Sequence, residues 1–152
     1  MSCFSDVQSI PPKADLSMNP VGKRCAYQKL DSGIREFIFL EKSPAAVDEW
    51  LLHFDRIMVN DPPQHGVKEL LLIDIRQHIP GAVYAAQKLH AWRRDYDLDD
   101  TNTCAAVLID KQSQMVMNMA NTVIRIVGLE VIKLQFFKHD RQKAIDWLLS
   151  ER

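Results

Sequence analysis

Six charged or histidine residues follow apolar runs of the sequence, at points where the strands of an α/β protein would end. Ligands of open α/β sheets bind beyond the carboxyl ends of the strands, so these side chains can converge on one site. Such a set could supply a general acid–base pair or bind a small anion. The interpretation that we favour is that they are capping residues, because the first amides of a helix need polar partners. The six residues are Asp74, Arg76, His78, Asp110, Lys138 and His139.

Asp74 is the most informative residue of this set because it follows four consecutive apolar residues. Its carboxylate should enter a partly dry environment, where it needs hydrogen-bond donors. One interpretation is a phosphoacceptor or catalytic acid. The other, which we favour, is a carboxylate that accepts hydrogen bonds from the amides of residues 75–78. We name Asp74, Arg76, His78 and Asp110 as the candidate ligand-binding or switch loop.

The common enzyme and cofactor signatures are missing from the sequence. It contains no GxGxxG, GxxxxGK[ST] or GxSxG, only five glycines, and no HxxxH or HExxH spacing among its five histidines. Glycine loops that cradle phosphates and paired zinc-binding histidines are therefore not encoded. No pair of nucleophile and base is evident either. We expect a protein without enzymatic activity, cofactor or bound metal.

Composition places the chain among ordinary globular proteins. Its 152 residues are 47% hydrophobic and 26% charged, which suits one domain over residues 23–152. Residues 1–22 are polar, hold three prolines and show no periodicity, so we expect a flexible tail. A net charge of −1 argues against nucleic-acid binding, which needs a basic surface.

Cysteine usage and hydropathy indicate the compartment. The three cysteines, Cys3, Cys25 and Cys104, form no CxxC pair, which favours free thiols in a reducing environment. No apolar run approaches the ~20 residues that span a bilayer. We therefore expect a cytoplasmic protein without a membrane span.

Hydrophobic periodicity predicts an α/β fold in the order β-β-α-β-α-β-α-β-α. Gly33 suits a tight turn between the first two strands, which should pair antiparallel. Strands separated by single helices should run parallel, giving a mostly parallel sheet with an antiparallel edge strand. Ser43 and Pro44 should begin the first helix, and Asp140 should cap the last. The expected strands are 24–30, 35–40, 69–75, 103–109 and 131–137, and the expected helices are 44–61, 82–96, 112–127 and 141–150.

The helix expected over 112–127 has more apolar surface than one buried face requires. Met117, Ala120 and Ile124 lie opposite its inward stripe. An exposed strip of this kind can bind a partner or a second copy, since Met adapts to irregular contacts. It can also be covered by the N-terminal tail, or consist of scattered apolar residues without a role. These alternatives stay open.

Four segments resemble STAS domains, the fold of the anti-sigma-factor antagonists, and in particular their small bacterial SpoIIAA-like branch. They are REFIFLEKSPAAVDEWL, ELLLIDIR, CAAVLID and FFKHDRQKAIDWLL. The likeness covers about residues 24–150 and rests on pattern more than on particular chemical groups. The last segment is similar to an aromatic strand, short turn and Ala-x-x-Trp-Leu helix of that family.

The resemblance implies a regulatory module that binds a protein partner or itself. In some relatives it implies an apolar ligand cavity, so a small apolar, lipid-like ligand is the alternative. The antagonists are switched by phosphorylation of a Ser at the start of the helix after the third strand. Here the matching loop, residues 74–81, has no Ser or Thr. We therefore expect no phosphorylation switch of that kind.

Overall fold

The computed structural model describes residues 22–96, 102–110, 118, 121–122, 125 and 132–152. The helix expected over 112–127, with its strip of Met117, Ala120 and Ile124, falls largely outside these residues, and so does the tail before Gly22. The expected strands and the other helices lie within about two residues of the described ones. These are β1 (Cys25–Lys29), β2 (Arg35–Phe39), α2 (Pro44–Asn60), β3 (Glu69–Asp74), α3 (Ala82–Asp95), β4 (Thr103–Ile109), β5 (Ile132–Lys138) and α5 (Arg141–Ser150).

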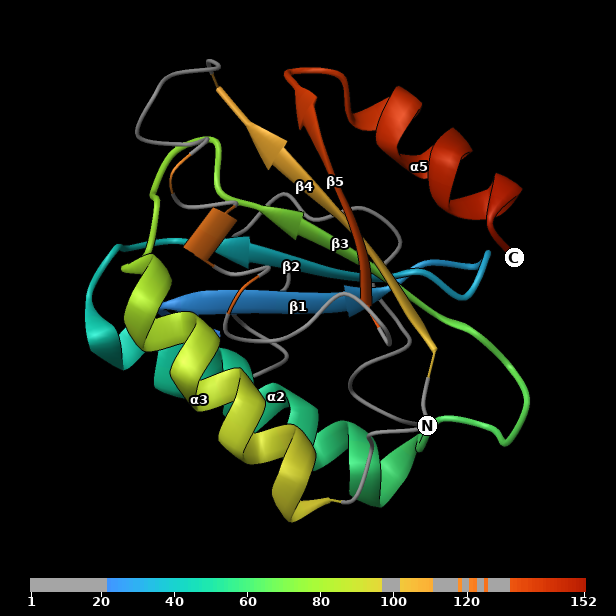
Figure 1. The fold of residues 1–152 in the computed structure, drawn as a ribbon, viewed down its shortest axis with the longest axis horizontal. Coiled ribbons are helices and arrows are strands. Elements are labelled where there is room, and N and C mark those ends of the chain that lie inside the picture. Colours follow the sequence, from blue (N-terminus) through green and yellow to red (C-terminus); the bar gives the residue numbers. More distant parts are fainter. Residues whose placement is uncertain (1–21, 97–101, 111–117, 119–120, 123–124, 126–131) are drawn as a thin grey trace.

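The five strands form one sheet in sequence order, β1-β2-β3-β4-β5 (Figure 1). β1 pairs antiparallel with β2, and the next three pairs are parallel, which confirms the predicted sheet. The β1–β2 turn depends on Gly33, whose φ of 93° suits a residue without a side chain. It is closed by the amides of Gly33 and Leu30, which donate to Leu30 and Ile34 carbonyls at 2.9 and 2.8 Å.

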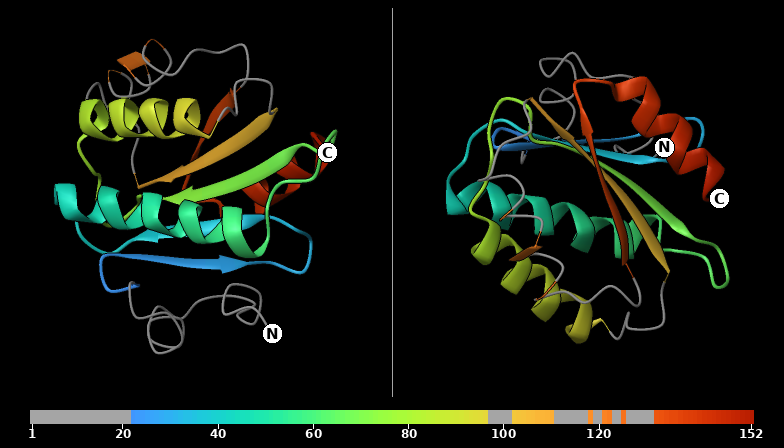
Figure 2. Two further views of the ribbon diagram at one scale, coloured as in Figure 1. Left: turned by 90° about the horizontal axis from the view of Figure 1, so that it is seen from below. Right: turned by 45° about the horizontal axis from the view of Figure 1, so that its top comes forward.

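Helices cover both faces of the sheet. α2 and α3 lie side by side on one face, and α5 lies on the other, against β3, β4 and β5 (Figure 2). β4 supplies both cores because its side chains alternate: Ala105 and Val107 face α2 and α3, whereas Ala106 and Leu108 face α5. This two-sided burial explains why the middle strands are continuous apolar runs.

Side chains of α2 cover part of the outer backbone of the edge strand β1. Glu49 accepts hydrogen bonds from the amides of Arg24 and Cys25 at 2.8 and 2.5 Å. His53 donates from Nε2 to the Cys25 carbonyl. Unpaired backbone at a sheet edge invites pairing with other chains, so these contacts protect the edge while fixing α2 against it.

The helix starts only partly follow the sequence prediction. Asp140 caps α5 as expected, accepting from the amide of Lys143 at 3.0 Å. Ser43 occupies the expected N-cap position before Pro44, but it makes no capping hydrogen bond. Its hydroxyl donates to the carboxylate of Glu41.

Cys25 and Cys104 are buried free thiols, and burial raises the pKa of Cys104.

None of the helices in the described residues is long and apolar enough to cross a membrane.

Lowering the pH should destabilise the protein because His53 is protonated more readily in the unfolded chain. Burial lowers the pKa of this fully buried side chain from 6.5 to about 4, with a smaller contribution from Arg56. Between these values the unfolded chain binds a proton that the folded protein does not, so acidification favours unfolding. We expect urea denaturation to show that the wild-type protein loses about 3 kcal/mol more than His53→Gln between pH 7 and pH 4. Equal losses in the two proteins would contradict this origin.

Candidate functional site

A pocket of about 520 Å³ opens at the carboxyl end of the parallel strands. Its described lining comes from the ends of β2 and β3 and from the residues that follow β3, β4 and β5. This is the position at which open α/β sheets bind ligands. The lining residues are Ile38, Phe39, Asp74, Arg76, Gln77, Asp110 and His139.

The sheet register brings these residues together. Asp74 pairs with Ile38 on one side and with Leu108 on the other, and Leu108 in turn pairs with Phe137. Asp110 and His139 each follow the end of their strand within two residues of this row. The ends of four strands that are distant in sequence therefore lie side by side.

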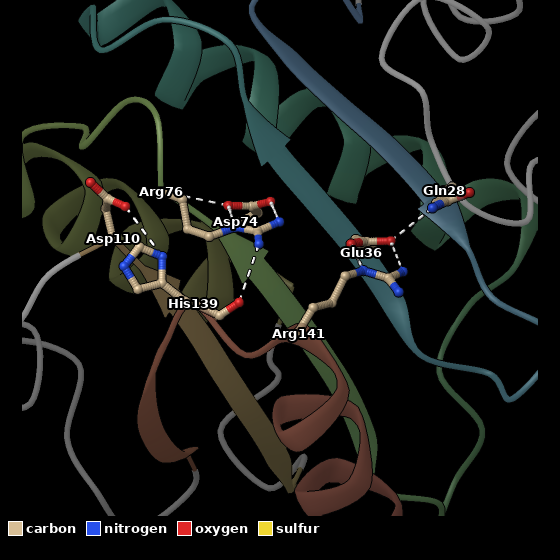
Figure 3. A network of polar contacts seen from close by, with 7 residues as sticks. All are labelled: Gln28, Glu36, Asp74, Arg76, Asp110, His139 and Arg141. Atoms are coloured by element: carbon tan, nitrogen blue, oxygen red, sulfur yellow. Dashed lines mark hydrogen bonds and ion pairs between the residues drawn. The ribbon is translucent and has the colours of Figure 1, made fainter.

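Asp74 and Arg76 form the innermost charged pair of the pocket (Figure 3). Arg76 donates from Nε to Oδ1 at 3.0 Å and from Nη2 to Oδ2 at 2.8 Å. The Arg76 amide also donates to Oδ1 at 3.0 Å, which confirms the interpretation that Asp74 binds the loop backbone. Hydrogen bonding to Asp74 raises the pKa of Arg76. The carboxylate is almost fully buried, so this bidentate pair holds the arginine in one orientation.

Asp110 and His139 form a second pair at the open side of the pocket. Nδ1 of His139 lies 3.3 Å from Oδ1 of Asp110, and both side chains are more than half exposed. His139 has a φ of 60°, uncommon for a residue other than glycine. In this conformation its amide donates to the Ile109 carbonyl at 2.9 Å, which ties the β5–α5 connection to the end of β4.

A third, buried pair fixes the start of α5 beside the pocket. Arg141 donates to both carboxylate oxygens of Glu36, at 2.9 and 2.7 Å, and Gln28 donates to the same carboxylate at 2.7 Å. Glu36 is 2% exposed, so its charge depends on these donors. The pair joins the first residue of α5, two positions after His139, to β2.

The structure brings together three of the four candidate residues, Asp74, Arg76 and Asp110. It does not bring His78 into the pocket: this residue is half-buried and is not part of the lining. His139 does line the pocket. It is one of the six residues expected at the strand ends, and it lies two positions after Phe137 at the end of the last strand. Lys138, the other residue at that end, does not line the pocket.

The described lining holds two carboxylates, one guanidinium, one imidazole and one amide beside two apolar residues. No Ser, Thr, Cys or Lys is found among its described lining residues. In the part of the chain that the structure describes, no cluster of three or more His, Cys, Asp or Glu could hold a metal ion. The Asp110–His139 pair could move a proton, but it has no adjacent nucleophile within the described lining.

No protein-family model, curated protein or solved structure matches the chain. The function of the pocket has to be argued from its geometry.

Asp74→Asn should destabilise the protein, whereas Asp110→Asn should not. The first substitution leaves the Arg76 guanidinium, which is one-third exposed, without its counter-ion and should cost about 2 kcal/mol of unfolding free energy. The second changes a carboxylate that is 60% exposed and should stay within about 0.5 kcal/mol of wild type. Urea denaturation at pH 7 measures both. Similar values for the two variants would show that the inner pair has no special role in stability.

Proposed function

We propose that the protein is a non-enzymatic regulatory module that binds a partner through the pocket at the strand ends. The observation that carries this proposal is that the ionisable side chains of the pocket lie in pairs. Asp74 holds Arg76 through two hydrogen bonds, and Asp110 lies against His139. Groups held in fixed orientations by their neighbours are suited to recognition, because little ordering is needed when a ligand binds.

An enzyme is the weaker alternative at this site. Enzymes with two carboxylates commonly separate their environments so that one is protonated and the other ionised. Here the carboxylate of Asp74 forms an ion pair with Arg76, and the carboxylate of Asp110 is largely exposed to solvent. Each carboxylate thus has its own partner, Arg76 for Asp74 and His139 for Asp110.

The resemblance to SpoIIAA-like STAS domains supports a binding role. The described elements follow the order on which that resemblance rests, apart from the helix expected over 112–127. In the closing segment, Phe137 of β5 packs on Trp147 of α5 with ring centroids 5.7 Å apart, and Ala144 is fully buried against the sheet. This is the strand–turn–helix arrangement that the sequence segment suggested. The loop after β3 would act without a phosphorylated Ser or Thr.

A small apolar ligand is a second candidate, favoured by Trp50. The indole N–H of this core residue is buried and has no hydrogen-bond partner among the residues that the structure describes. A ligand carbonyl or carboxylate bound between α2 and the sheet would satisfy it, since buried donors are normally paired. Native mass spectrometry of freshly purified protein tests this candidate, and a clean apo mass would count against it. Self-association through Met117, Ala120 and Ile124 stays a prediction outside the described residues.

The binding proposal predicts a ligand that is bound and not converted. Two-dimensional NMR with a panel of small amines, carboxylates, phosphates and short peptides should give saturable shifts at residues 74–77, 110 and 139. His139→Asn should weaken the best binder about tenfold, because it removes the imidazole while Asn tolerates the left-handed backbone. His90→Asn, on the exposed surface of α3, is the matched control. Multiple turnovers of any compound that depend on His139 would overturn the proposal.

A further inference from the structure

Among the described lining residues of the pocket, the formal charges do not cancel. Two carboxylates, Asp74 and Asp110, oppose one guanidinium, Arg76, among the described lining residues, with histidine counted as neutral. Arg76 is already neutralised by Asp74 through two hydrogen bonds. The excess negative charge therefore lies on Asp110, at the open side of the pocket.

Asp110 is available to a ligand. Its side chain is 60% exposed, and its described contact with His139 is made by Oδ1, at 3.3 Å. An ionised carboxylate is an acceptor at both oxygens and can receive two parallel hydrogen bonds from a guanidinium. In the described part of the chain no hydrogen bond engages Oδ2, so this exposed carboxylate has an acceptor to offer.

Further acceptors lie around the same opening. In the described part of the chain, the carbonyl of His139 accepts a long hydrogen bond of 3.5 Å from Arg76 Nη1. Gln77 is exposed in the lining and offers an amide oxygen. Ile38, half-buried near the end of β2, supplies apolar carbon beside these groups. Acceptors at the rim and apolar carbon beside them match a long basic side chain, which buries its stem and keeps its charged end among acceptors.

We infer that the pocket binds a cationic side chain, arginine or lysine, presented by a protein partner. The inference rests on the proposed function and names the partner chemistry of that site. A side chain on a partner fits better than a free metabolite, because small-molecule sites usually enclose most of their ligand. Here the two groups at the opening, Asp110 and His139, are both more than half exposed.

The test is an NMR titration with end-blocked tripeptides that carry Arg, citrulline or Glu between two alanines. The Arg peptide should bind with saturable shifts at residues 110 and 139, and citrulline, its uncharged isostere, should bind at least about fivefold more weakly. Asp110→Asn should abolish that preference. Asp146→Asn, on the exposed surface of α5, should leave it unchanged. Rising ionic strength should weaken the Arg peptide alone.

Three outcomes would overturn the inference. They are equal binding of the Arg and citrulline peptides, stronger binding of the Glu peptide, and an Arg preference that survives Asp110→Asn. Agmatine binding tighter than the Arg peptide would overturn the assignment to a protein side chain. If an anion saturates the same resonances, only the cationic partner fails and the proposed binding function stands. Catalytic turnover would remove the proposed function itself.

Discussion

The common direction of four neighbouring strands decides where the polar groups of the pocket lie. The four strands from β2 to β5 are parallel and paired in register, so their carboxyl ends lie next to one another at one end of the strands. For β2, β3 and β4 this direction goes with the helical connections, because α2 lies between β2 and β3 in the chain and α3 lies between β3 and β4. Residues 74, 110 and 139 lie close together because of this shared strand direction, and not because they are close in the sequence.

The charges at that edge are stabilised mainly by one another. Asp74 occupies a nearly dry position, where an isolated carboxylate would be costly, and Arg76 supplies both charge and hydrogen bonds from two residues away. Glu36 is held in the same way by Arg141 from the start of α5. The carboxylates of Asp74 and Glu36 are thus already paired within the protein. Asp110 is left as the acidic group that can meet another molecule, which is why we favour recognition over catalysis.

Much of the fold could be predicted from the sequence, because apolar runs, Gly33 and Asp140 each carry a local signal. The three pocket residues Asp74, Arg76 and Asp110 could be predicted because strand ends coincide in a parallel sheet. The directions of side chains in the connections could not be predicted. His78 lies outside the pocket, and a loop has no periodicity from which the direction of its side chains could be predicted. The Glu36–Arg141 pair joins residues 105 positions apart, and a charge within a strand ordinarily indicates a solvent-facing position.

The central claim, that the inner pair is a fixed structural element, is tested most directly by water exchange of the Arg76 side chain. Nitrogen-detected NMR can follow the Nε–H of individual arginines. We predict that Arg76 exchanges at least about tenfold more slowly than Arg94, which is exposed on α3, as about 1.4 kcal/mol of protection requires. Equal exchange at the two arginines would mean that Asp74 does not hold Arg76, and the pocket would lose its ordered interior.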